Sequence, residues 1–563
     1  MEKNTFDAIV VGTGVSGGWA AKELTEKGLK TLVLDRGPMV KHGDYPTAMK
    51  APWELPYADE PTQEDIRRHP KHTRPSFYGI TQSTKHWFVD DLDNPYEETQ
   101  PFDWFRGYHV GGRSLMWGRQ SYRFSEMDFE ANAKDGVGVD WPIRYKDLAP
   151  WYDYVEHFIG VSGSTENMAQ LPDGQFLKPM ELNCVEKDFQ GKIGEKFNRR
   201  LIIGRTANLS EALKHDQSPQ RGTCQYRNLC MRGCPFGGYF SSNSSTLPSA
   251  ERTGNMTIVT NAIVYEVIYD NAKGRATGVR VLDAETGHQT EYFAKVIFLN
   301  ASTFGTTHIL LNSVSSRFPN GFGNDSGEVG HNIMDHIFGN GAGALVEGHE
   351  DRYYSGRRPN GFYIPRYRNV GADKRSYLRG FGYQGGASRS DWTRLVDEAV
   401  LGDDLKRAAE KPGPWEVSMM GFGEMLPNHK NMVSLDRRIK DKYGLPVLNF
   451  DVMHRENEHV MTKEMVDDAM EMFTAAGYKN VHSFTMKANP GAGIHEMGTA
   501  RMGRDPKTSV LNAWNQMHAC KNVFITDGSA MASSACQNPS LTYMALTARA
   551  ASHAVDELKR GNI

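Results

Sequence analysis

The stretch that most constrains the fold lies at the start of the chain, where a strand pattern runs directly into a glycine-rich turn. Residues 8–11, Ala-Ile-Val-Val, form a short apolar run of the kind found in buried parallel strands. Gly12, Gly14 and Gly17 follow at GxGxxG spacing. Glycines at these positions allow a tight turn and let the backbone approach a pyrophosphate at the N-terminus of the following helix.

The next residues complete a strand–turn–helix–strand unit. A helix is expected around residues 20–24, and a second strand over residues 31–34 ends at Asp35. Asp35 lies 21 residues after Gly14, where an acidic group hydrogen-bonds a ribose hydroxyl. The unit predicts nucleotide binding by an α/β domain with a mostly parallel sheet, but it does not by itself separate NAD from FAD.

Length and charge exclude several classes of protein. A chain of 563 residues has room for two or more domains. Its 65 basic and 68 acidic residues give a net charge of −3, so we expect no binding to nucleic acid or to an anionic membrane surface. No apolar run approaches the roughly 18 residues of a membrane span, and the opening residues contain no apolar signal region. We therefore expect neither a membrane span nor a secretory signal.

Four further segments identify the kind of nucleotide site. Residues 106–118, RGYHVGGRSLMWG, resemble the flavin-contacting glycine loop of the glucose–methanol–choline (GMC) oxidoreductase family, whose members bind FAD. Residues 298–306, FLNASTFGT, resemble that family's strand and turn returning to FAD. Residues 329–336, VGHNIMDH, and residues 523–529, VFITDGS, are similar to two further family segments. With the opening motif and a closing motif, six blocks follow the family order across nearly the whole chain.

The resemblance implies that FAD is bound non-covalently. Relatives that attach FAD covalently do so through a His in the flavin loop, followed by Trp, whereas here Met116 precedes Trp117 and His109 lies ahead of the Gly-Gly pair. Thr542 has a second interpretation, as the start of the final helix. The residues expected at the cofactor are Gly12, Gly14, Gly17, Asp35, Arg36, Gly111, Gly112, Ser114, Met116, Trp117, Asp527, Gly528, Asn538 and Thr542.

The closing motif supplies a candidate catalytic pair. His495 lies in GIHEMGTARMG and Asn538 in CQNPSLT, 43 residues further on. Oxidising an alcohol requires a base for the hydroxyl proton, and the near-neutral pKa of His suits that task. The resemblance implies that His495 is this base and that Asn538 holds the hydroxyl so that its C–H points at flavin N5. His336, in the VGHNIMDH segment, is expected to be structural.

Three of the six cysteines cluster in a Gly- and Pro-rich segment. Cys224, Cys230 and Cys234 have the spacing C-x5-C-x3-C-P, which resembles iron–sulfur ligation. The pattern predicts a 3Fe-4S cluster, or a 4Fe-4S cluster if a distant ligand such as Cys184 joins. A zinc site would favour paired Cys or Cys/His ligands, which are missing here. A local disulfide and uncoordinated thiols remain alternatives.

The resemblance also implies an activity. Within the family the chain most resembles bacterial sugar dehydrogenase large subunits of the gluconate, glucose and glucoside 3-dehydrogenase types. We expect oxidation of a secondary alcohol of a sugar or glycoside, with C3 of a hexopyranoside as the best specific position. Alternatives are an oxygen-using pyranose, glycoside or other alcohol oxidase, an NAD-linked dehydrogenase, and a flavin-bearing electron-transfer subunit without a substrate.

Partners and location follow from the same resemblance. A small subunit and a cytochrome c or quinone electron acceptor are expected, because an iron–sulfur cluster would pass electrons singly. Related large subunits are exported folded with a partner that carries the signal, so a periplasmic location is expected, with a cytoplasmic enzyme as the alternative.

The expected architecture has two parts. Residues 1–50, 100–135, 200–340 and 490–563 form a discontinuous, Rossmann-like α/β domain that binds FAD. Residues 51–99, 136–199 and 345–489 form an α+β substrate domain and covering segments. Alternating patterns near residues 362–367, 416–420 and 432–435 predict strands of one antiparallel sheet over the flavin, and residues 456–476 predict an amphipathic helix.

Overall fold

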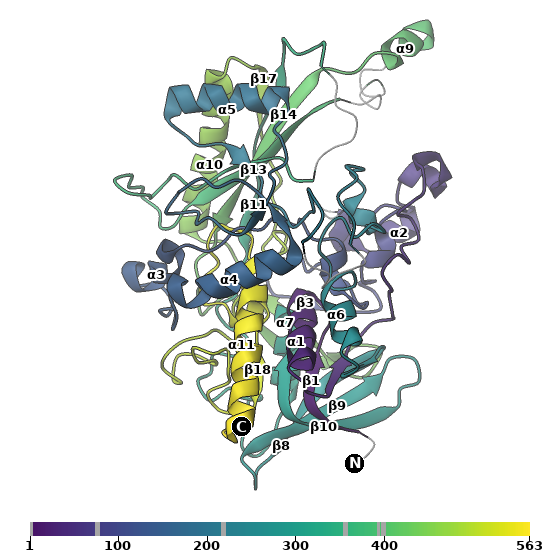
Figure 1. Ribbon diagram of the computed structural model, residues 1–563, viewed down its shortest axis with the longest axis vertical. Helices are drawn as coiled ribbons and strands as arrows, with labels where there is room; N and C mark the ends of the chain where they lie inside the picture. The colour runs from purple at the N-terminus through teal and green to yellow at the C-terminus, as the bar shows by residue number, and fades with distance from the viewer. Residues whose placement is uncertain (1–3, 74–78, 215–220, 353–358, 391–394, 396–400) are drawn as a thin grey trace.

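Two sheets lie one above the other along the long axis of the molecule (Figure 1). The computed structural model describes residues 4–73, 79–214, 221–352, 359–390, 395 and 401–563. The larger sheet is at the lower end of Figure 1, where both chain termini also lie, and the antiparallel sheet is at the upper end. None of the helices in these ranges is long and apolar enough to cross a membrane.

The lower sheet has seven strands in the order β7-β2-β1-β10-β9-β8, and β18 also pairs with β10. Strands β7, β2, β1, β10 and β18 run parallel, while β8, β9 and the start of β10 form an antiparallel meander. The strands are β1 (Thr5–Val11), β2 (Thr31–Leu34), β7 (Met256–Val259), β8 (Ala262–Asp270), β9 (Arg275–Asp283), β10 (Gln289–Leu299) and β18 (Val523–Ile525).

Helices cover both faces of this sheet because its central strands are apolar on both sides. Val10 and Phe298 pack towards α1 (Val15–Glu26) and α11 (Ser540–Arg560), while Ile9 belongs to the core on the opposite face with α7 (Thr303–Asn312). Phe298 also stacks on Phe524 of β18 with ring centroids 5.0 Å apart. The predicted strand–turn–helix–strand unit and the Rossmann-like α/β fold are confirmed.

The upper sheet has six antiparallel strands in the order β17-β11-β14-β13-β12-β6. One face is covered by α5 (Cys184–Phe197) and α10 (Glu456–Ala475), and the hydroxyl of Tyr383 donates to the carbonyl of Met465 at 2.6 Å. The predicted helix near residues 456–476 is therefore present. The strands are β6 (Ile202–Ile203), β11 (His336–Val346), β12 (Phe362–Ile364), β13 (Phe381–Arg389), β14 (Trp415–Glu424) and β17 (Lys479–Thr485).

One predicted strand belongs to a different sheet. Residues 432–435 lie in β15 (Met432–Lys440), which pairs with β16 (Pro446–Asp451) and, through it, with β3 (Glu97–Glu98). The prediction of one common sheet was wrong because alternation identifies a strand but not its partner. Here the short turn after β15, in which the Asp441 carboxylate accepts backbone N–H groups from Tyr443 and Leu445, directs the chain back onto β15.

Helix α4 (Tyr145–Ile159) packs against α11 in the main core, and the other remaining elements are short. These short elements are α2 (Gln63–Arg68), α3 (Glu126–Asp135), α6 (Thr246–Arg252), α9 (Gly402–Ala409), β4 (Val161–Ser162) and β5 (Phe176–Leu177).

Candidate active site

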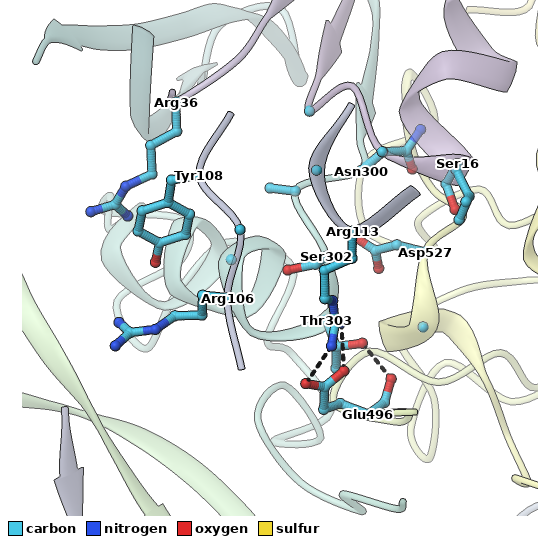
Figure 2. A pocket seen from close by; sticks show the side chains of 18 of the residues that line it. Ser16, Arg36, Arg106, Tyr108, Arg113, Asn300, Ser302, Thr303, Glu496 and Asp527 are labelled. Carbon is cyan, nitrogen blue, oxygen red and sulfur yellow. Dashed lines mark hydrogen bonds and ion pairs between the residues drawn. The ribbon is translucent and has the colours of Figure 1, made fainter. Parts of the chain in front are cut away.

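A cavity begins at the carboxyl ends of β1 and β2 and extends to the closing motif (Figure 2). The opening glycine turn, the flavin loop and the closing segment all contribute to its wall, although they are far apart in the sequence. The predicted site residues that line it are Gly12, Gly14, Asp35, Arg36, Gly112, Ser114, Trp117, His495, Asp527, Gly528 and Asn538.

The N-terminus of α1 opens into this cavity without a capping side chain. Its N-cap is Gly14, which has no side chain to cap the helix, and the first turn contains no acidic residue. The unpaired N–H groups and the helix dipole together favour an anion at this point. Gly17 does not line the cavity but permits the turn, since a Cβ there would lie 1.9 Å from the carbonyl oxygen of Gly12.

Asp35 directly follows β2 at the cavity wall, and three hydrogen bonds hold its carboxylate in place. Its carboxylate accepts the backbone N–H of Thr13 at 3.1 Å, the hydroxyl of Thr13, and the backbone N–H of Gly37 at 3.0 Å. Burial raises its pKa to about 6. Next to it, the Arg36 guanidinium lies 4.2 Å from the ring centroid of Tyr108 (Figure 2). A fixed carboxylate and a stacked guanidinium suit the ribose and base of a dinucleotide.

Three further predicted cofactor residues lie behind the wall. Gly111, at a φ of +90°, donates its backbone N–H to the Thr13 hydroxyl at 2.8 Å and so joins the flavin loop to the opening turn. Met116 is buried in an apolar cluster, and Thr542 shares a hydrogen bond of 2.7 Å with the hydroxyl of Tyr152 inside the protein. Whether these side chains touch the cofactor stays a prediction.

The closing segment brings His495 and Asn538 together. Nε2 of His495 lies 3.4 Å from Nδ2 of Asn538, and Nδ1 of His495 lies 2.7 Å from Nδ1 of His336. Nε2 of His336 lies 2.9 Å from the carbonyl oxygen of Ala535. Because a carbonyl only accepts, this contact places the proton of neutral His336 on Nε2 and leaves its Nδ1 as an acceptor. His495 must then carry its proton on Nδ1, and its Nε2 lone pair faces Asn538.

Burial keeps both imidazoles neutral. It lowers the pKa of His495 well below 6.5, with nearby His336 and Arg113 acting in the same direction. Burial also lowers the pKa of His336 to about 4. At neutral pH His495 is therefore an unprotonated base whose tautomer is fixed by its neighbour.

His336, which the sequence predicted to be structural, contacts the candidate base His495 directly. Its contacts are with His495 and Ala535, which lie 159 and 199 positions further along the chain, so spacing alone could not reveal them. We expect His336→Phe to lower kcat about 10- to 100-fold, because it removes the acceptor that selects the His495 tautomer. Rapid-mixing measurement of flavin reduction checks this effect. An unchanged rate would contradict the tautomer assignment.

The neighbouring backbone is held by buried carboxylates. Asp335 accepts backbone N–H groups from Gly491 and Gly493 at 2.9 Å and from His495 at 3.0 Å. On the other side, Arg113 forms two hydrogen bonds of 3.0 and 2.6 Å to Glu496 (Figure 2). These bonds fix the loop that carries His495 in relation to the flavin loop, a preorganisation that catalysis requires.

Two buried polar atoms at the cavity wall fit a bound cofactor. Nδ2 of Asn300 and the hydroxyl of Tyr543 have no hydrogen-bond partner within the described part of the chain, and both residues line the cavity. Buried polar groups are normally paired, so these atoms await a ligand with hydrogen-bonding groups. With the open N-terminus of α1, they fit the phosphates and ring system of FAD.

Comparison with known proteins decides the family. Models described as GMC oxidoreductase match residues 6–338 and residues 427–547. The chain belongs to the GMC oxidoreductase family. It is an FAD-dependent oxidoreductase acting on CH–OH donors.

Similar proteins match along nearly their whole length. The 2-methyl-1,2-propanediol dehydrogenase of Mycolicibacterium austroafricanum is 26% identical, over 97% of this chain and 94% of that protein. The fructose dehydrogenase large subunit of Gluconobacter japonicus is 26% identical, over 100% of this chain and 99% of that protein. Among solved structures, pyridoxine 4-oxidase from Mesorbium loti has a TM-score of 0.59 at 16% identity, covering 97% of this chain and 98% of that one, which supports the fold.

The three clustered cysteines line a second, smaller pocket. Cys224, Cys230 and Cys234 are all partly buried and free, so the local disulfide is not formed in this structure. Within the described ranges, no group of three or more His, Cys, Asp or Glu side chains is arranged to hold a metal ion. The geometry therefore does not support the predicted iron–sulfur cluster.

The lowered pKa of His495 has a measurable consequence. Its neutral form persists below pH 6.5. We therefore expect protonation of His495 to lower kcat/KM for the alcohol only when the pH falls well below about 6.5. The same shift makes the free energy of unfolding depend on pH. His495 costs no stability above its unfolded pKa, where it is neutral in both states. Stability is lost as the pH falls from there through the folded pKa, because the unfolded chain binds the proton first. A pH profile of flavin reduction checks this prediction. A wild-type limb near pH 6.5 or above that the His495→Ala variant lacks would contradict it.

Proposed function

We propose that this protein is a dehydrogenase that oxidises a secondary alcohol of a sugar or glycoside, with C3 of a hexopyranoside as the preferred position. The observation that carries the proposal is the neutral His495, whose Nε2 lone pair faces Asn538 at the wall of the FAD cavity. The names of the two similar dehydrogenases, for a diol and for fructose, support a polyhydroxylated substrate.

His495 and Asn538 divide the work on the substrate hydroxyl. Nε2 of His495 takes the hydroxyl proton, while an N–H of Asn538 donates to the oxygen and stabilises its developing negative charge. When bound, FAD supplies the acceptor for the hydride that leaves the carbon bearing this hydroxyl. With FAD bound, the alcohol would lose its hydroxyl proton to His495 and the hydride from its carbon to that acceptor, leaving a ketone.

We propose further that FAD is held without a covalent bond and that electrons leave to a cytochrome c or quinone through a partner subunit in the periplasm. The relative named as a large subunit supports a multi-subunit assembly. The iron–sulfur cluster remains a proposal from cysteine spacing alone. Iron analysis per bound FAD, with electron paramagnetic resonance, tests it. Three or four iron atoms per FAD would support the cluster, and a protein without iron would exclude it.

Turnover of a substrate panel tests the proposed activity. Purified, FAD-loaded protein is given hexopyranosides, their 3-deoxy analogues and simple secondary alcohols, with either an artificial dye or oxygen as the acceptor. We expect dye reduction with the glycosides, loss of it with the 3-deoxy analogues, and little oxygen consumption. Rapid oxygen consumption would instead support the alternative, an oxidase of the same family. Equal rates with the 3-deoxy analogues would contradict oxidation at C3.

A further inference from the structure

Gln384 lies on the face of the upper sheet that looks towards the catalytic pair. It is on β13, directly opposite Tyr363 of β12 and Met420 of β14. Neighbouring Tyr383 points the other way, into the core under α10. Because side chains alternate along a strand, Gln384 extends from the face opposite that core.

The Gln384 side chain reaches the catalytic asparagine. Its Nε2 lies 2.6 Å from Oδ1 of Asn538 and donates a hydrogen bond to it. Asn538 is buried, with 7% of its surface exposed, whereas Gln384 is partly exposed, so the bond is part-buried. The bond joins the sheet of the substrate domain to the segment that closes the flavin domain.

This bond determines which end of the Asn538 amide faces His495. With Oδ1 held by Gln384, the NH2 group must point towards Nε2 of His495, 3.4 Å away. The reverse orientation would place the amide oxygen against the Nε2 lone pair, two acceptors with no proton between them. With the Gln384 amide in its present orientation, it would also leave two NH2 groups facing each other.

We propose that Gln384 is a positioning residue that fixes the Asn538 amide so that its NH2 group donates to the substrate oxygen. The proposal rests on the proposed roles of His495 and Asn538. Gln384 acts through Asn538 and does not itself exchange a proton. Hydrogen bonds aimed at developing charge chiefly affect the chemical step, so its loss should lower kcat more than it raises KM.

Two substitutions separate positioning from packing. Gln384→Glu keeps the shape of the side chain, but its ionised carboxylate cannot donate to Oδ1 and instead accepts from the Asn538 NH2 group, which turns the amide round. Gln384→Leu removes the bond altogether. We expect both variants to lower kcat about tenfold or more. A residue needed only for packing would tolerate the Glu variant, since Glu and Gln have the same shape.

A double-mutant cycle with Asn538→Ala provides the decisive kinetic test, and Met420→Leu on the adjacent strand serves as the control. We expect Gln384→Leu to lower kcat in the wild-type background and to have no further effect when Asn538 is Ala. The proposal is overturned if the loss is equal in both backgrounds or if Gln384→Glu keeps wild-type kcat.

Neutron crystal structures of the FAD-loaded wild type and Gln384→Glu variant, which locate the amide hydrogens, test the same proposal without any turnover. We expect the Asn538 amide to be turned in the variant, and an unchanged amide with unchanged partners would overturn the proposal. Failure of the proposed function is distinguishable, because no alcohol would then reduce the flavin in the wild type, whatever the orientation of Asn538.

Discussion

The His495→Ala variant is expected to fold and to bind FAD, but to reduce it with alcohol about 10²- to 10⁴-fold more slowly than the wild type. His495 is the neutral imidazole whose unprotonated Nε2 faces Asn538, so its removal leaves the substrate proton without an acceptor. Anaerobic rapid mixing, with flavin absorbance as the signal, measures the chemical step directly.

His288→Ala is a matched control for this variant, because His288 is exposed on the surface and is not among the residues that line the cavity. It should reduce flavin at the wild-type rate. A His495→Ala variant that retains FAD and is reduced within a factor of about three of the wild type, far less than loss of a general base costs, would show that another group takes the proton.

Gly17→Ala is expected to lose FAD and to lower the melting temperature. The added methyl group would lie 1.9 Å from the carbonyl oxygen of Gly12, a backbone atom that cannot move without opening the turn. Overpacking of this kind typically costs about 1–3 kcal/mol of stability. Thermal unfolding and the ratio of flavin to protein absorbance measure the two effects.

Two other glycines sharpen this test. A Cβ at Gly14 meets no atom within 4 Å and Gly14 lines the cavity, so Gly14→Ala should weaken FAD binding while leaving the apoprotein as stable as the wild type. Gly191 lies within α5 in open space, and Gly191→Ala should leave both properties unchanged or raise stability by up to about 1 kcal/mol. Full FAD occupancy in Gly17→Ala would contradict the role given to the turn.

The sequence predicted those features that depend on local pattern. The apolar run, the glycine turn and Asp35 share one short segment, in which β1 pairs with β2 and the Asp35 carboxylate accepts hydrogen bonds from Thr13. Family resemblance likewise identified His495 and Asn538, which the fold brings into contact from 43 positions apart.

Features that depend on distant partners were not predictable in this way. The strand over residues 432–435 was assigned to the wrong sheet, since its pairing with β16 is set by a turn further along the chain. His336 was treated as structural, because its hydrogen bonds to His495 and to Ala535 exist only in the folded protein. The Arg113–Glu496 pair and Gln384 were missed for the same reason.

The most direct test of the central claim is anaerobic mixing of the FAD-loaded protein with a methyl hexopyranoside that carries either hydrogen or deuterium on the oxidised carbon. The proposed mechanism predicts that the flavin band bleaches in a single turnover and that deuterium slows the bleaching severalfold, since the C–H bond breaks as His495 takes the hydroxyl proton. A flavin that no sugar or secondary alcohol bleaches would contradict the account.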